Sequence, residues 1–215
     1  MFGDPISNSN MWSKKQLKYL TTKIGSGATP KGGKESYIDK GITLIRSMNV
    51  YNGHFKYDDL AHITENQAAQ LDNVTLEEDD VLLNITGASV ARSCILPSKL
   101  LPGRVNQHVS IIRCNEEINP LFINHLLISN VFQQLLLSIA RAGGATREAI
   151  TKDQLESLLI ICPPIDLQNQ FADFVKQVDK SKFLLATMRN LVLKLTNYDK
   201  NNITFLCWKK NTCLQ

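Results

Sequence analysis

Residues 166–197 read DLQNQFADFVKQVDKSKFLLATMRNLVLKLTN, and this stretch decides the expected architecture. Counted from Phe171 in alternating steps of three and four, it forms one stripe that is apolar except at Ser181: Phe171, Phe174, Val178, Ser181, Leu185, Met188, Val192 and Leu195. Neither Pro nor Gly interrupts the run. Such a heptad pattern predicts a helix of about 30 residues, roughly 45 Å long, that lies along another helix.

Two interpretations of this helix stay open. A rod of that length extends beyond a compact domain and favours a partner, whereas an ordinary amphipathic helix packs on its own domain. Leu184 and Leu191 widen the apolar stripe, which favours contact with more than one neighbouring helix. After Asn197 the heptads break, and residues 198–215 mix aromatic residues and two cysteines without periodicity, so we expect a poorly ordered tail.

The length of 215 residues suits one domain, residues 12–165, followed by the helix at 166–197 and the tail. The hydrophobic fraction of 43% and the charged fraction of 20% are those of a soluble globular protein. No apolar run reaches the roughly 18 residues of a membrane span. Residues 1–10 are polar and turn-rich without an apolar targeting segment, so we expect a frayed start and a cytoplasmic protein with no membrane partner.

Charge is unevenly distributed along a chain whose net charge is only +4. Residues 1–56 carry nine Lys/Arg against three Asp/Glu, whereas residues 57–91 carry eight acidic residues and no basic one. Segregation of this kind can place a positive surface on a nearly neutral molecule. The distribution therefore permits binding to nucleic acid, although solvated charge runs are common.

Short periodic segments between turn signals predict an α+β fold. The basic segment 23–34 holds four glycines and a proline, so an irregular loop is expected there, and Asn52-Gly53 predicts a hairpin turn. An edge segment is expected at 12–20, and strands at 41–50, 80–85, 94–96, 105–113 and 158–162. Helix starts are expected at the capping signals Thr64, Asn119-Pro120 and Thr151, with Asn130 dividing the helical segment 121–140.

The acidic run Glu77-Glu-Asp-Asp80 is the strongest candidate for a metal site, and it supports a metal-dependent nuclease as the enzymatic alternative. Such runs before a strand are more often solvated turns, and no second carboxylate cluster accompanies this one. The four histidines share no ligand spacing, and no pair among the five cysteines has C-x-x-C spacing. Walker A loops and nucleophile elbows are missing too. We expect no catalytic residue, no metal and no bound cofactor.

The remaining candidates are polar and basic side chains suited to DNA. The glycine-rich loop offers groups that hold phosphate, and Asn, Gln and Arg suit bidentate contacts with bases. Residues 106–108 also admit interpretation as a polar network joining two elements, and residues 143–147 as a helix end and turn. The candidate DNA-binding residues are Ser26, Thr29, Lys31, Lys34, Arg46, Asn49, Tyr51, Lys56, Ser89, Arg92, Arg104, Asn106, Gln107, His108 and Arg147.

A series of short motifs follows this order: Gly27-x-Thr29-Pro30, Gly41-Ile42, Asp80-Val-Leu-Leu, Thr86-Gly-Ala-Ser89, Val105-Asn-Gln-His108, Gly144-Ala-Thr146, Leu158, Pro163-Pro164 and Gln170. With the heptad helix at the end, this order resembles one half of a specificity subunit of a type I restriction-modification system. The resemblance runs from about Trp12 to Leu195. The chain departs from the family by its single set of domain and helix, by Asp79 and Ala91 where glycine is usual, and by its tail.

The resemblance implies a non-catalytic subunit that recognises DNA. It implies a target recognition domain, which reads part of a split site in double-stranded DNA, and a helix that pairs with a second half and docks methyltransferase subunits. The resemblance also implies a restriction subunit that completes the complex. S-adenosylmethionine, ATP and magnesium would then belong to those partners and not to this chain.

A half-length chain can restore two domains by forming a two-fold dimer. Two domains separated by rods of roughly 45 Å would contact DNA segments about one helical turn, ~34 Å, apart. The non-enzymatic alternative is a protein-interaction module in which the helix is the whole function and the domain is its scaffold. We expect a homodimer, with antiparallel helices, through Phe171, Phe174, Val178, Leu185, Met188, Val192 and Leu195.

Overall fold

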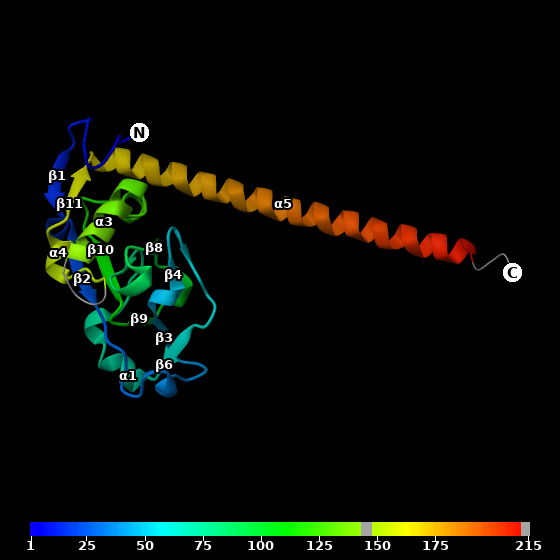
Figure 1. Cartoon of the computed structure of the whole chain (residues 1–215), viewed down its shortest axis with the longest axis horizontal. Coiled ribbons are helices and arrows are strands. Elements are labelled where there is room, and N and C mark those ends of the chain that lie inside the picture. The colour runs from blue at the N-terminus through cyan, green and yellow to red at the C-terminus, as the bar shows by residue number, and fades with distance from the viewer. Residues whose placement is uncertain (143–147, 212–215) are drawn as a thin grey trace. The chain divides into compact units, whose positions relative to one another are not determined.

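The computed structural model of the chain describes residues 1–142 and 148–211, with side chains described as far as residue 191 apart from the same gap. The chain divides into two compact units, Met1–Asn169 and Gln170–Gln215. The first unit is an α+β domain of short strands and helices, and the described part of the second is helical (Figure 1). Arg147 and the motif at 144–146 lie outside the described residues.

The described elements are short apart from the last helix. The strands are β1 (Ser13–Gln16), β2 (Thr21–Ser26), β3 (Ile42–Ile45), β4 (Val50–Tyr51), β5 (His54–Phe55), β6 (Ala61–Ile63), β7 (Val81–Asn84), β8 (Ser93–Ile95), β9 (Gly103–Val105), β10 (Val109–Cys114) and β11 (Leu159–Cys162). The α-helices are α1 (Glu65–Ala69), α2 (Pro120–Leu127), α3 (Asn130–Ala142), α4 (Lys152–Glu156) and α5 (Ile165–Asn211). The 3-10 turns are η1 (Leu17–Tyr19), η2 (Gly33–Ser36), η3 (Ser47–Asn49), η4 (Asp72–Val74), η5 (Gly87–Ser89) and η6 (Ser98–Leu100).

Two sheets share the main core of the domain. A four-stranded antiparallel sheet has the order β2-β10-β7-β8, and its inner strand β7 is buried at every position, as the apolar run after Asp80 predicts. A second sheet has the order β6-β3-β9, in which β3 and β9 are parallel. Apolar side chains of the two sheets pack together, and their burial is the main force that holds the domain. The completely buried residues of this core include Leu44, Ile45, Val105 and Ile111.

Capping residues begin the helices where the sequence predicts them. The side chains of Thr64, before α1, and Thr151, before α4, each accept a hydrogen bond from the backbone N–H of a glutamine three residues on. The side-chain oxygen of that glutamine, Gln67 or Gln154, accepts in turn from the backbone N–H of the threonine. Asn119 accepts from two N–H groups of the first turn of α2. Within the described residues no single helix has the length and hydropathy of a membrane span; α2 and α3 reach them only when taken together, across a 70° bend.

The glycine-rich segment and the segment 105–113 differ from the prediction. Residues 23–26 belong to the edge strand β2 and not to a loop, because Gly25 still pairs with Ile111 of β10. The expected strand at 105–113 is two strands, β9 and β10, joined by residues 106–108. Gly27 lies against this connection, since a Cβ at that position would stand 1.8 Å from the carbonyl oxygen of Val105. Likewise, the expected strand at 41–50 is interrupted by the turn η3.

The first residues pack on the domain, contrary to the frayed start that their polarity predicts. The Phe2 ring lies edge-on to the Phe122 ring, with 4.9 Å between centroids. Trp12 Nε1 donates to the carbonyl oxygen of Phe2 at 3.1 Å, and its backbone N–H donates to Asn8 Oδ1 at 3.0 Å. Phe2 and Trp12 thus anchor a polar segment on the domain. Strand β1 follows and pairs with β11.

Helix α5 continues to Asn211, beyond the predicted end at Asn197. The break in the heptads does not end it, because residues 198–211 contain neither Pro nor Gly. Its apolar stripe is exposed at Phe174, Leu185 and Met188 (62%, 67% and 63%), while Phe171 and Val178 are half-buried. The side chains of the last two stripe positions, Val192 and Leu195, lie outside the described residues. Pairing of this stripe with another helix stays a prediction.

Candidate nucleic-acid interface

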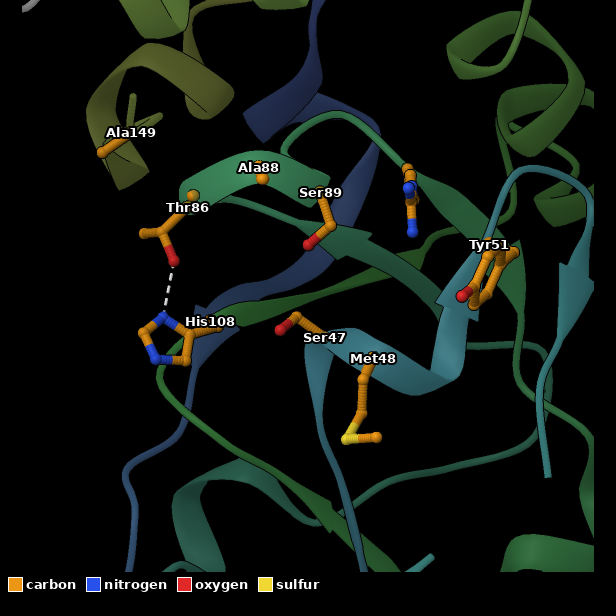
Figure 2. Close-up of a pocket in the computed structure, with 10 residues that line it drawn as sticks. Ser47, Met48, Tyr51, Thr86, Ala88, Ser89, His108 and Ala149 are labelled. Atoms are coloured by element: carbon orange, nitrogen blue, oxygen red, sulfur yellow. Dashed lines mark hydrogen bonds between the residues drawn. The ribbon is translucent and has the colours of Figure 1, made fainter. Parts of the chain in front are cut away.

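A depression of about 510 Å³ lies between the β4–β5 hairpin, the turn η5 and the connection before β10 (Figure 2). We call it the hairpin pocket. It brings together four candidate residues from distant parts of the sequence: Tyr51, Ser89, Arg92 and His108. In Figure 2 the hydroxyl groups of Ser47 and Ser89 lie between His108 and Tyr51. Sequence reasoning missed the rest of the lining, whose small or apolar side chains carry little chemical signal: Ser47, Met48, Thr86, Gly87, Ala88 and Ala149.

Three planar groups stack beside the hairpin pocket. The Arg92 guanidinium lies 4.6 Å from the centre of the Tyr51 ring, and that ring stacks on the His54 imidazole at 5.2 Å. The hairpin that carries both rings is attached to β8, because the backbone N–H of Ser93 donates to Asn52 Oδ1 at 3.2 Å. Guanidinium and aromatic faces are the surfaces on which nucleobases stack.

A chain of hydrogen bonds links the glycine-rich loop to the hairpin pocket. Thr29 Oγ1 donates to Gln107 Oε1, and Gln107 Nε2 donates to His108 Nε2 at 3.1 Å. Since His108 Nε2 accepts in this arrangement, Nδ1 carries the ring proton and donates to Thr86 Oγ1 (Figure 2). This series of hydrogen bonds joins three segments of the protein, which favours the interpretation of residues 106–108 as a polar network.

Asn84, at the end of β7, is completely buried and joins the two sides of the hairpin pocket. Its amide nitrogen donates to the carbonyl oxygen of Ser47 at 2.8 Å and to Ser89 Oγ at 3.1 Å. Its Oδ1 is buried without a hydrogen-bond partner in the part of the chain that the structure describes. Sequence reasoning missed this residue, although a polar side chain that ends an apolar strand is a usable signal.

Three candidate residues lie in the interior, where their polar groups serve the fold. Asn49 is completely buried, and its side chain bonds three backbone groups around the hairpin. Arg104 is 8% exposed and pairs with Asp72 at 3.0 Å. Asn106 is 5% exposed, and its Oδ1 accepts from the backbone N–H of His108 at 3.0 Å. Because burial keeps these side chains from a large ligand, none of the three is proposed as a DNA contact.

The other candidates outside the hairpin pocket lie nearer the surface. Lys31 and Lys34 are exposed on the segment between β2 and β3. Arg46 is half-buried, with its guanidinium 5.5 Å from the ring centre of Tyr37. Lys56 forms an ion pair with the neighbouring Asp58 at 3.5 Å. Ser26, the last residue of β2, lines a different pocket.

The acidic run contributes to an internal ion pair. Asp80 is completely buried and accepts two hydrogen bonds from Arg113, at 2.8 Å from Nε and 2.9 Å from Nη2. Glu77 contacts the same guanidinium. The hydrogen bonds that Arg113 donates to Asp80 raise the pKa of Arg113. Among the described residues there is no group of three or more potential metal ligands. The pairing of Asp80 with Arg113 argues against the nuclease alternative.

Three solved structures share the fold of this domain. The chain is similar to a structure titled for complex assembly and conformational transition of the type I R-M system, with a TM-score of 0.57 and 16% identity. It is equally similar, at 0.57 and 15%, to the HsdS subunit from Thermoanaerobacter tengcongensis. In both cases the match covers 79% of this chain and 38% of the other. The S subunit from M. genitalium matches at 0.52 and 15%, over 79% and 39%.

These likenesses show the fold, and the chain spans about two fifths of the length of the structures that it matches. No curated protein matches it. The family model for the type I restriction modification DNA specificity domain matches residues 10–195, which is most of the chain. The chain belongs to this family, and the resemblance seen in the order of its motifs is confirmed.

Proposed function

We propose that this chain recognises DNA as a half-length specificity subunit of a type I restriction-modification complex. The hairpin pocket carries the proposal, because it is an open depression that joins an Arg–Tyr–His stack to hydroxyl and imidazole groups. Such groups recognise base edges through hydrogen bonds and base faces through stacking. Family membership supports a role in specificity, with catalysis in partner subunits.

The proposed interface uses two kinds of contact. Exposed Lys31 and Lys34 hold phosphates, which provides affinity that depends on salt and not on sequence. Arg92, Tyr51 and Ser89 contact bases and determine preference. The chain of hydrogen bonds through Gln107 and His108 has a supporting role, since it holds the phosphate-binding loop beside the base-reading pocket.

The proposed assembly is a homodimer through α5, with the two domains on the halves of a bipartite site. A two-fold dimer of this chain would present two recognition domains, one to each half of the site. The exposed apolar side chains of Phe174, Leu185 and Met188 support helix pairing and docking of methyltransferase and restriction subunits. Sedimentation of the chain as a monomer at high concentration, alone and with DNA, would remove the dimer from the proposal.

The test is methylation mapping. The chain is co-expressed with a methyltransferase subunit of a type I system, and modified adenines are located across the host DNA. We expect modification at one split sequence that changes when Arg92 is replaced by Gln. Methylation that is identical with and without the chain, over several methyltransferase subunits, contradicts the proposal.

A further inference from the structure

A second cavity, of about 350 Å³, lies at the edge of the four-stranded sheet and shares no lining residue with the hairpin pocket. Strand β2, the turn η4 and helix α4 contribute to its wall. Two of the ten lining residues are lysines, Lys23 of β2 and Lys152 of α4, and none is a carboxylate. We call this cavity the edge pocket.

The two lysines lack strong partners. Lys23 forms no ion pair with any residue that the structure describes. Lys152 pairs with Glu156, one turn further along α4, at 3.4 Å, and the lysine side chain is 62% exposed. An exposed pair at this helical spacing contributes little and is easily exchanged for another partner. The edge pocket therefore has an excess of positive charge.

Neutral hydrogen-bonding groups surround the lysines. Ser26 and Ser110 face each other across the β2–β10 pairing, and both line the pocket. Ser110 is only 2% exposed, yet among the described residues its hydroxyl has just one long contact, 3.4 Å to the carbonyl oxygen of Ile111. A buried hydroxyl whose hydrogen bond is this long can donate to a ligand instead. Asn73 of η4 adds an amide to the same wall.

The backbone of β2 leaves room for a ligand. Gly25 lines the pocket, and a Cβ at this position would meet no atom within 4 Å. Strand β2 is at the edge of its sheet, so half of its backbone N–H groups are not paired with β10. Apolar residues such as Val74 and Leu155 complete the wall, which strengthens electrostatic attraction inside the pocket.

We infer that the edge pocket binds a phosphate group, with Lys23 and Lys152 as its cationic contacts and Ser26, Ser110 and Asn73 as its neutral donors. A phosphate offers several acceptor oxygens, and the pocket presents donors from four separate elements. The phosphate belongs either to a DNA backbone or to a free phosphoester. Both sources share this chemistry, and the inference does not depend on the proposed function.

The first experiment uses inorganic phosphate as the probe. Binding to the full chain is measured by calorimetric titration, with chloride at matched ionic strength as the reference. The variant K23Q/K152Q is compared with K18Q/K180Q, which loses the same charge at two exposed lysines outside the pocket. Unaltered circular dichroism establishes that each variant is folded. We expect the Kd for phosphate to rise about tenfold or more in K23Q/K152Q alone. Equal affinities in the two variants, or no binding by the unmodified chain, overturn the inference.

The second experiment identifies the source of the phosphate. Affinity for duplex DNA is measured against salt concentration for the same variants. A salt slope lower by about 0.9 in K23Q/K152Q than in K18Q/K180Q assigns the pocket to a backbone phosphate. An unchanged slope, together with lost phosphate binding, assigns it to a free phosphoester. If the unmodified chain binds phosphate but no duplex, the proposed function fails while the phosphate site stands.

Discussion

Replacement of Asp80 by Ala should destabilise the domain by about 3 kcal/mol, because it leaves the partly buried Arg113 guanidinium without its main partner. Asp80 is completely buried and accepts two hydrogen bonds from Arg113 and one from the backbone N–H of Glu77, all between 2.8 and 2.9 Å. Breaking a buried pair from one side costs about 3–5 kcal/mol. The lower end of this energy range applies to Asp80→Ala, because the Arg113 side chain is 18% exposed and keeps its contact with Glu77.

Urea unfolding followed by circular dichroism measures this effect. In thermal unfolding of a chain of this size, the same loss of about 3 kcal/mol corresponds to a fall in Tm of roughly 6–12 °C. The matched control is Asp79→Asn, which alters the exposed neighbour and keeps a residue that tolerates its positive φ of 62°. We expect the control to change stability by less than about 0.5 kcal/mol. Adding Arg113→Met to Asp80→Ala should recover part of the loss. Equal stability of Asp80→Ala and Asp79→Asn would refute the reasoning.

Three further predictions concern packing, thiol chemistry and specificity. Gly27→Ala should destabilise by about 3 kcal/mol, since its Cβ would collide with the carbonyl of Val105, whereas Gly25→Ala, in open space, should change urea unfolding little. Burial raises the pKa of the Cys94 thiol to about 12 from 9.0, so mass spectrometry at pH 8 should find alkylation on the order of a thousandfold slower than in the urea-unfolded chain. Alkylation of Cys94 as fast in the folded chain as in the unfolded one would contradict this raised pKa. Because the pKa is raised on folding, the contribution of this thiol to stability is complete below pH 9 and should be lost as pH rises from 9 towards 12. Finally, Lys31→Ala and Lys34→Ala should weaken binding to all duplexes alike, whereas Arg92→Gln should alter preference at one base pair by about 1–3 kcal/mol, and uniform losses for both classes would reject the division.

Local signals in the sequence predict most of the elements. Caps at Thr64, Asn119 and Thr151 lie where their helices begin, because each cap acts on the N–H groups of the adjacent turn. The Asn52-Gly53 turn joins β4 to β5 for the same local reason. The order of the motifs identifies the family, since it reflects the whole domain and not one element.

Contacts between distant segments explain the errors. Glycine-rich residues 23–26 are read as a loop from their composition, yet pairing with β10 makes them a strand. Arg104 and Asn49 have the chemistry of DNA-contacting residues, but tertiary packing buries both. Asn84 is overlooked because its importance comes from the hairpin and turn that it joins, which composition does not reveal. The surface role of a polar residue thus depends on topology.

Hydrogen exchange tests the central claim, that the hairpin pocket is the face that touches DNA. The duplex found by methylation mapping is added to the chain, and protection of backbone amides is measured by mass spectrometry. Protection is expected in residues 47–55 and 86–92, which form the two sides of the hairpin pocket, with little change in α2 and α3. Protection of α2 and α3, with unchanged exchange in residues 47–55 and 86–92, would contradict the claim.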